Sequence, residues 1–233
     1  MTTGAAIVFG AGAGLGAATV RRFRAGGLKT VAVSRNEAKL RGVFAGEPDV
    51  LCIAADATDS RAVADAIDQA EAEAGPLCAA IANSAAWKIA PLLEHSPEDF
   101  EAVWKQGSLA AFNILHHAGN RMAARGSGSI LFTGSAAQMR AGSGFGPMAV
   151  AKLGLRALVQ AGARELGPKG IHVGHVVVDG PIDSDRTRAS NSDHSKLIDP
   201  AGIAEAFWFL HNQPRNAWTN ELDIRTGSEW PAG

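Results

Sequence analysis

Short apolar runs alternate along this chain with longer amphipathic segments. The first six of the seven short runs are nearly continuous in apolar residues, which is typical of parallel strands buried on both faces. The predicted strands are Ala5–Phe9, Thr30–Val33, Val50–Ala54, Leu77–Ala82, Ser129–Thr133, His172–Val178 and Glu221–Arg225. This alternation predicts an α/β protein.

Between the strands, the apolar residues follow the period of a helix. In 63–70 they stand at i, i+3, i+4 and i+7, which gives a helix with one apolar face. Ser96, Pro97 and Asp99 have the order of an N-cap, a proline in the first turn and an acidic third residue. They predict a helix that begins there and runs to about Met122.

The repeated alternation predicts a doubly wound parallel sheet of Rossmann type, with about seven strands and helices on both faces. No internal repeat and no linker-like shift in composition divides the chain, so we expect one domain over residues 1–233. The segment 179–199 is polar, rich in Ser and Asp, and without periodicity. It is long for an ordinary connection, and we expect it to be a mobile substrate lid.

Composition narrows the classes of function. The 22 basic and 23 acidic residues leave a net charge of −1, which does not favour binding to nucleic acid or to an anionic membrane. Residues 1–20 carry no charge, but five glycines interrupt them and no basic segment precedes them, so we do not expect a signal peptide. Cys52 and Cys78 lie in apolar runs and indicate reduced thiols of a soluble cytoplasmic protein. His172 and His175 point to opposite faces of one strand, and no metal site is predicted.

A glycine-rich loop joins the first strand to a helix expected at Ala17–Arg24. Gly10, Gly14, Leu15 and Gly16 stand at this junction. A dinucleotide needs such a loop because the turn is tight, the backbone must approach the diphosphate, and the helix N-terminus offers N–H groups. Because the chain has 27 glycines, the alternative is a cluster produced by composition alone. The position between a strand and a helix favours dinucleotide binding.

The end of the second strand bears on which dinucleotide binds. NAD-specific sites usually place a carboxylate there, whereas this chain has Ser34 and Arg35, and its first carboxylate is Glu37. A guanidinium suits the 2′-phosphate of NADP, which we therefore favour, with NAD still possible. The alternative for Arg35 is a solvated side chain. After the third strand, Asp56 and Ala57 are candidates to bind the adenine, and the alternative for Asp56 is a helix cap.

These features resemble the short-chain dehydrogenase/reductase family over essentially the whole chain. The three glycines match its signature, with Phe9 where Thr is usual. Residues 81–85 are similar to its Asn-Asn-Ala-Gly segment, and 179–184 to its Pro-Gly-Pro-Ile-Asp-Thr stretch. The resemblance implies further coenzyme contacts at Asn83, Lys152, Gly180 and Ile182.

The family's catalytic group is Asn, Ser, Tyr and Lys. The resemblance assigns its Ser to Ser135 and its Lys to Lys152. Its Tyr position falls on Met148 and its Asn position on Gly107, and the chain contains no tyrosine at all. Two of the four groups are therefore absent, as in an atypical subgroup that lacks the catalytic Tyr.

The loss of the phenol changes the chemistry that the family's site implies. A thioether has no proton to give, so Met148 cannot protonate an alkoxide. Ser135 is expected to polarise the carbonyl, while Lys152 either donates the proton or only holds the nicotinamide ribose. We expect Gln138 and Met148 to line the substrate side of the site. The alternative for Met148 is packing in the core.

Three functions remain open at this point. The first is an NADP-preferring oxidoreductase that transfers hydride to or from a small carbonyl, alcohol or activated alkene. The second is a non-redox enzyme that uses the nucleotide structurally, and the third is a nucleotide-binding protein without turnover. The resemblance also implies a homo-oligomer, either a tetramer or a dimer.

Overall fold

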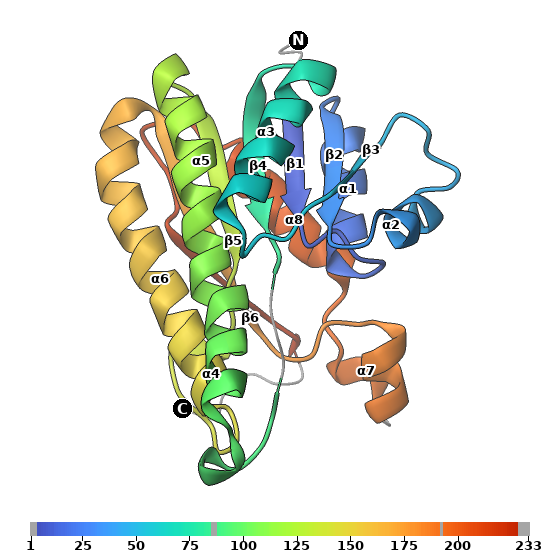
Figure 1. Ribbon diagram of the computed structural model, residues 1–233, viewed down its shortest axis with the longest axis vertical. Coiled ribbons are helices and arrows are strands. Elements are labelled where there is room, and N and C mark those ends of the chain that lie inside the picture. Colours follow the sequence, from blue (N-terminus) through green and yellow to red (C-terminus); the bar gives the residue numbers. More distant parts are fainter. Residues whose placement is uncertain (1–3, 85–87, 192, 228–233) are drawn as a thin grey trace.

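The computed structural model describes residues 4–84, 88–191 and 193–227 (Figure 1). Its strands are β1 (Ala5–Phe9), β2 (Lys29–Ser34), β3 (Leu51–Ala54), β4 (Leu77–Ala82), β5 (Gly128–Thr133), β6 (Ile171–Asp179) and β7 (Glu221–Arg225). Its α-helices are α1 (Leu15–Ala25), α2 (Glu37–Val43), α3 (Ser60–Ala74), α4 (Pro97–Trp104), α5 (Ala110–Arg125), α6 (Gly146–Leu166), α7 (Asp185–Ser190) and α8 (Pro200–His211). All seven predicted strands are confirmed, with shifts of a few residues at their ends.

The strands form one parallel sheet in the order β3-β2-β1-β4-β5-β6-β7. Helices α3, α5 and α6 cover one face, and α1, α2 and α8 cover the other (Figure 1). Each face has its own buried cluster, because the apolar strands bury side chains on both sides. The predicted fold class, a single Rossmann-like α/β domain, is confirmed.

The chain reverses its direction of travel across the sheet beside β1. It moves from β1 through β2 to β3 at one edge, and then returns to place β4 on the other side of β1. In open α/β sheets the carboxyl ends of strands at such a switch point diverge and leave a crevice. The fold therefore locates a binding site at the ends of β1 and β4.

The helix expected from Ser96 to about Met122 is present but interrupted. Its start is confirmed, because Ser96 and Asp99 form a capping box at the N-terminus of α4. The stretch Lys105–Leu109 is a π-helical turn, and α5 continues from it to Arg125. The spacing of apolar residues is similar in both helical forms, so the sequence pattern did not distinguish them.

The segment 179–199 contains more regular structure than its composition indicates. It includes α7 and a 3₁₀ turn, His194–Lys196. Ile182 and Ile198 pair in a parallel β-bridge, which brings the two ends of the segment together. The helix begins at a capping box of Ser184 and Thr187, a local signal that needs no apolar periodicity.

Candidate functional site

The glycine-rich loop after β1 has two tightly packed positions and two open ones. Gly10 has a φ of +79°, and a Cβ there would lie 2.6 Å from the carbonyl oxygen of Asn83. A Cβ on Gly16 would lie 2.5 Å from the carbonyl oxygen of Gly10. At Gly12 and Gly14, by contrast, no described atom lies within 4 Å of a Cβ position. Gly10 and Gly16 therefore pack tightly against the protein, whereas Gly12 and Gly14 leave space on the side of the crevice.

The N-terminus of α1 faces this opening without a cap of its own. Gly14 is its N-cap, no described side chain caps it, and its first turn carries no acidic residue. Its first N–H groups and the positive end of the helix dipole are thus available to an anion. This arrangement fits the diphosphate of a dinucleotide.

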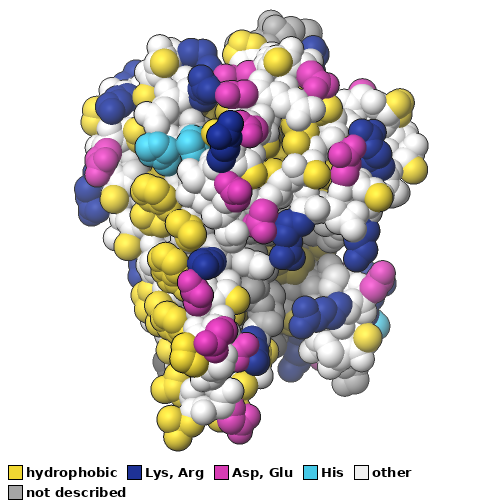
Figure 2. Space-filling view, in the orientation of Figure 1, with side chains coloured by type: hydrophobic (Ala, Val, Ile, Leu, Met, Phe, Trp, Pro, Cys, Tyr) yellow, Lys and Arg dark blue, Asp and Glu magenta, His cyan; other side chains and the backbone are white. Residues whose placement is uncertain are grey.

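A cleft of about 260 Å³ opens at the switch point between β1 and β4. Six of the predicted coenzyme residues line it together: Gly10, Ser34, Arg35, Asp56, Ala57 and Asn83. They come from the carboxyl ends of four adjacent strands and the loops that follow, which is why they are far apart in the sequence. Figure 2 shows the surface hollowed between the body of the molecule and the part that carries α7.

The end of β2 leaves a guanidinium at the cleft rather than a carboxylate. Arg35 is exposed there, and no carboxylate of the described residues pairs with it. Glu37, the first carboxylate after the strand, lies in α2. Its Oε1 accepts a hydrogen bond from the Nε of Arg41 at 2.7 Å, so this carboxylate is already paired. Asn36 caps α2 by accepting a hydrogen bond from the Lys39 N–H.

Asp56 does not cap the helix that follows it. That role belongs to Asp59, which accepts hydrogen bonds from Arg61 and Ala62 at the start of α3. Asp56 instead accepts from the N–H and the hydroxyl of Thr58, at 2.9 Å each. These bonds fix its carboxylate at the wall of the cleft.

Asn83 ties the loops after three strands together. Its amide donates to the carbonyl oxygen of Gly10 at 3.3 Å and accepts from the hydroxyl of Thr133 at 3.0 Å. The glycine loop, the end of β4 and the end of β5 are therefore held by one side chain.

Ser135 and Lys152 both lie at the carboxyl end of β5. Ser135 is the N-cap of a 3₁₀ turn, Ala136–Gln138, and its Oγ accepts from the Ala137 N–H. Lys152 projects from α6 and its Nζ donates to the carbonyl oxygen of Thr133 at 2.7 Å. It is only 4% exposed, and this burial lowers its pKa from 10.5 to about 8.

The two residues expected on the substrate side are buried instead. Gln138 is 1% exposed, and its amide is folded back onto Ser135 and His175. A buried amide needs hydrogen-bonding partners, and the 3₁₀ turn supplies them on the inner side. Met148 is 4% exposed and packs with Val103 and Ala137, which corresponds to the alternative of core packing.

The π-helical turn contains Gly107, where the resemblance to the family places Asn. A Cβ on Gly107 would lie 2.6 Å from the Cβ of Ala151 on α6, so a side chain there requires the helices to separate. Ser108 fastens the same contact by donating to the carbonyl oxygen of Ala151 at 2.8 Å. Gln106 precedes the glycine and lines the cleft, which sequence reasoning missed. Only its position directly before Gly107 could have indicated this.

The segment after β6 lies beside the glycine loop. Gly180 has a φ of +148°, a conformation that favours glycine, and Ile182 packs against the core under α1 and α8. A smaller hollow of about 250 Å³ is lined by Gly14 from the loop and by Asp183 and Ser184 from the segment. The chain that follows Gly180 and Ile182 therefore lies beside the glycine-rich loop.

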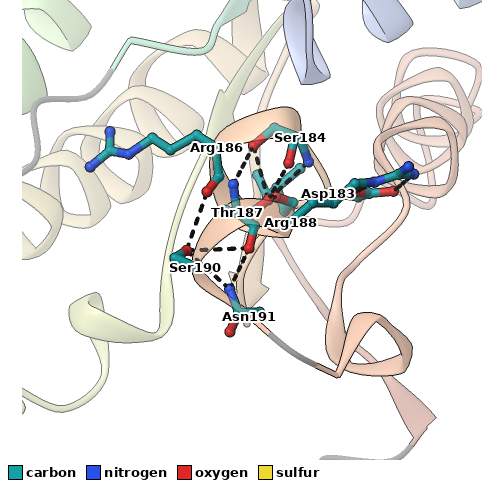
Figure 3. A network of polar contacts seen from close by, with 8 residues as sticks. Asp183, Ser184, Arg186, Thr187, Arg188, Ser190 and Asn191 are labelled. Atoms are coloured by element: carbon teal, nitrogen blue, oxygen red, sulfur yellow. Dashed lines mark hydrogen bonds and ion pairs between the residues drawn. The ribbon is translucent and has the colours of Figure 1, made fainter.

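Figure 3 shows how the start of α7 is held. The hydroxyl of Thr187 donates to the carbonyl oxygen of Ile182 at 2.7 Å, and Ser184 accepts from the Thr187 N–H. Arg188 binds both oxygens of Asp183 at 2.6 Å. The side chain of Arg186 extends away from this network (Figure 3).

The chain matches the short chain dehydrogenase family over residues 4–195. It belongs to this family. By this membership it is an NAD(P)-dependent oxidoreductase. None of the helices in the described ranges has the length and apolar character needed to cross a bilayer. Within the same ranges, no group of three or more His, Cys, Asp or Glu side chains is placed to hold a metal ion.

Relatives and solved structures agree with this membership. The chain is 33% identical over 172 residues to an L-xylulose reductase of Mesocricetus auratus, covering 73% of this chain and 69% of the relative. It is 30% identical over 183 residues to the 3-oxoacyl-[acyl-carrier-protein] reductase MabA of Mycobacterium tuberculosis, covering 78% and 71%. A crystal structure of a short-chain dehydrogenase from Rhodopseudomonas palustris is 35% identical, with a TM-score of 0.83, over 97% of this chain and 99% of that one.

Proposed function

We propose that this protein is an NADP-preferring reductase or dehydrogenase of a small, mostly apolar carbonyl compound, alcohol or activated alkene, working without the usual tyrosine acid. When bound, the coenzyme supplies or accepts the hydride. The observation that carries the proposal is a buried lysine, Lys152, held next to the Ser135 turn. The open glycine loop and the cleft at the switch point support the coenzyme half of it.

The preference for NADP rests on Arg35. Its guanidinium stands at the cleft free of carboxylates among the described residues, and Glu37 is engaged by Arg41. A guanidinium recognises a phosphate through paired, charge-assisted hydrogen bonds. The binding site would thus attract a 2′-phosphate and offer no carboxylate to a free ribose 2′-hydroxyl.

The proton chemistry rests on Lys152 and Ser135. With a pKa of about 8, the ammonium of Lys152 gives up a proton far more readily than an exposed lysine does. The carbonyl oxygen of Thr133 orients its Nζ by accepting one of its hydrogens. We propose that Ser135 hydrogen-bonds the substrate oxygen while Lys152 protonates it.

Coenzyme binding is tested first, and turnover is tested after it. NADPH and NADH are titrated against the emission of the five tryptophans, and a panel of carbonyl compounds and alkenes is then followed at 340 nm. We expect tighter binding of NADPH and oxidation with at least one compound. Tight binding with no oxidation across the panel would contradict the proposed reaction.

The role of Lys152 is tested by substitution. Lys152→Ala should lower kcat for reduction by about 10²–10⁴-fold, the usual contribution of a general acid. In the native enzyme, reduction should decline as the pH rises through about 8, because the protonated donor is lost. Lys39→Ala, on the exposed side of α2, is the matched control. A raised Kd for NADPH with unchanged kcat at saturation would leave Lys152 only the role of holding the ribose.

We also propose that the protein is a cytoplasmic homo-oligomer, either a dimer or a tetramer. Two free cysteines, Cys52 and Cys78, support a reducing compartment. Light scattering after gel filtration measures the assembly, and a monomeric mass at micromolar concentration would contradict it.

A further inference from the structure

A chain of polar side chains runs from the edge of the sheet to the Ser135 turn. The Oε1 of Gln138 accepts a hydrogen bond from the Ser135 N–H at 3.3 Å. The Nε2 of the same amide lies 2.7 Å from the Nε2 of His175, which is completely buried on β6. Gln138 thus connects the backbone of the proposed substrate-binding serine to a buried imidazole.

Charged groups stand at the same ring nitrogen, Nε2. The carboxylate of Glu221 on β7 lies 3.1 Å from the Nε2 of His175. Arg156 on α6 holds that carboxylate with two hydrogen bonds, at 2.8 and 3.1 Å. Lys152 lies one helical turn before Arg156, so the same helix carries both the proposed proton donor and the end of this chain.

The two contacts at Nε2 favour different forms of the ring: the Glu221 carboxylate favours an N–H there, and the shorter Gln138 contact favours a lone pair. The amide nitrogen of Gln138 can only donate, so the 2.7 Å contact makes the Nε2 of His175 an acceptor. The ring proton then lies on Nδ1, which is buried and has no hydrogen-bonding partner among the described residues. In this neutral form the lone pair of His175 faces both Gln138 and Glu221.

Protonation reverses this preference. An Nε2–H would donate to Glu221 and form an ion pair, but it would oppose the amide N–H of Gln138. If the amide turned its oxygen to the ring, its nitrogen would face the Ser135 N–H, and that bond would be lost. The backbone of Ser135 and the protonation of His175 are therefore coupled through one amide.

The surrounding backbone is shaped to hold these side chains close. Gly134 lies directly before Ser135, and a Cβ on it would lie 2.5 Å from the Oε1 of Gln138 and 3.1 Å from the ring of His175. The N–H of Gly134 donates to the carbonyl oxygen of Val176 at 2.7 Å. Even a methyl group at this position would push the amide away from the ring.

We propose that His175 is a positioning residue for Ser135: in its neutral form it orders the Gln138 amide and through it the serine turn, and on protonation it releases that turn. The proposal rests on the proposed function, since Ser135 is the group that would bind the substrate oxygen. The groups that act on the ring are Glu221 on β7, Arg156 on α6, Gln138 and the backbone of Asn220. Burial and Arg156 oppose protonation, and Glu221 favours it, with a net lowering of the His175 pKa below 6.5.

Steady-state kinetics with substituted enzymes test this in the full-length protein. His175→Phe removes the acceptor and should lower kcat about 10–100-fold, with the Kd for NADPH unchanged, because the ring is buried and is not among the residues that line the cleft. His175→Gln keeps an acceptor near the Nε2 position and cannot titrate. In the native enzyme, kcat should fall at acid pH, below 6.5, because protonation of His175 releases the turn. His175→Gln should restore kcat and abolish this fall. The proposal would be overturned if kcat were unchanged in His175→Phe, or if the activity of His175→Gln still fell at acid pH as in the native enzyme.

The matched control is His172→Gln on the same strand. His172 is also buried, and it contacts the carbonyl oxygens of Leu210 and Thr219 rather than the serine turn. This substitution should lower the free energy of unfolding by an amount comparable to that of His175→Gln. It should leave the fall of activity at acid pH unchanged. If His172→Gln also abolished the fall of activity at acid pH, any buried histidine of β6 could produce that fall, and the assignment to His175 would be overturned.

A measurement on the native protein separates this proposal from the proposed reaction. In NMR spectra recorded between pH 8 and 5, the Ser135 amide should shift with the same midpoint as the His175 ring. The proposal is overturned by an amide that does not move during that titration, and equally by a ring that stays neutral until the protein unfolds. Because no turnover is needed, a failed substrate panel would refute the reaction and leave this result to decide the role of His175.

Discussion

Met148 stands where the resemblance to the family places its tyrosine, and the surroundings of Met148 bear on which group could act in place of a phenol. The side chain is buried against Val103, Ala137 and Ala149 rather than facing an open cavity. Its thioether fills space and has no proton to transfer. In the proposed reaction the proton comes from a neighbour of Met148, and Lys152 lies one helical turn further along α6.

The first prediction concerns Met148→Tyr. We expect a gain of at least about 10-fold in reduction of simple ketones by NADPH, because a phenol is a general acid. The larger ring should lower the free energy of unfolding by about 1–3 kcal/mol, since the site is already filled. Absorbance at 340 nm and urea denaturation measure the two effects. Met148→Phe is the control for size, and equal activity in both variants would contradict a role for the hydroxyl.

The second prediction concerns Arg35→Ala. We expect the Kd for NADPH to rise by about 10–100-fold, which corresponds to the loss of hydrogen bonds from a charged group, while the Kd for NADH stays within about 2-fold. Titration of the tryptophan emission measures both constants. Arg164→Ala removes an exposed arginine in the last turn of α6 and serves as the control. A parallel loss for both coenzymes would mean that Arg35 does not read the 2′-phosphate.

Single residues differ in how far the sequence could predict them. Arg35 and Asp56 lie within two residues of strand ends, so the strand pattern alone predicted that they lie at one edge of the sheet, and they line one cleft. Gln138 was expected to face the substrate and is buried. Its partner His175 lies thirty-seven positions away on another strand, and nothing in the local pattern indicates that contact.

At the scale of elements, the contact between the π-helical turn and α6 is the least ordinary feature. Gly107 and Ala151 approach so closely that the wider turn and the small residues depend on each other. π-helical turns occur frequently at functional sites, and this one carries Gln106 to the wall of the cleft. The sequence predicted the start of α4 from its capping box, but a pattern of apolar spacing cannot show a single wider turn within a helix.

The third prediction tests this contact. Gly107→Ala should lower the free energy of unfolding by about 1–3 kcal/mol, because its methyl group meets Ala151. Adding Ala151→Gly should recover a large part of that loss. Gly42→Ala in α2 is the control, since no described atom lies within 4 Å of its Cβ position, and it should stabilise the protein by up to about 1 kcal/mol. Urea denaturation measures all four proteins, and equal stability of Gly107→Ala and the native chain would contradict a tight contact.

At the scale of the whole molecule, buried histidines link stability to pH. Burial lowers the pKa of His211 from 6.5 to about 4, and it lowers the pKa values of His172 and His175 in the same direction. Between about pH 6.5 and 4 the unfolded chain therefore binds more protons than the folded protein does. Stability should be greatest above pH 6.5 and fall as the pH is lowered through this window.

The fourth prediction gives this effect a size. His211 alone should contribute a loss of about 3 kcal/mol between pH 6.5 and 4, at roughly 1.4 kcal/mol for each pH unit of difference between the folded and unfolded pKa values. Urea denaturation at pH 7.5, 6 and 5 measures the slope. His211→Gln should lessen it, because glutamine does not titrate. A stability that is independent of pH over this range would contradict the burial of these rings as neutral groups.

The bridge between Ile182 and Ile198 has a consequence for how this enzyme can diversify. Because Ile182 and Ile198 pair with each other at the two ends of the intervening loop, the number of residues between them should have little effect on the sheet. Closing a flexible loop of twice the length costs only about 0.6 kcal/mol more. Insertions and deletions there would leave folding and the glycine-rich loop intact, so evolution can alter the α7 segment next to the hollow while the rest of the protein stays constant.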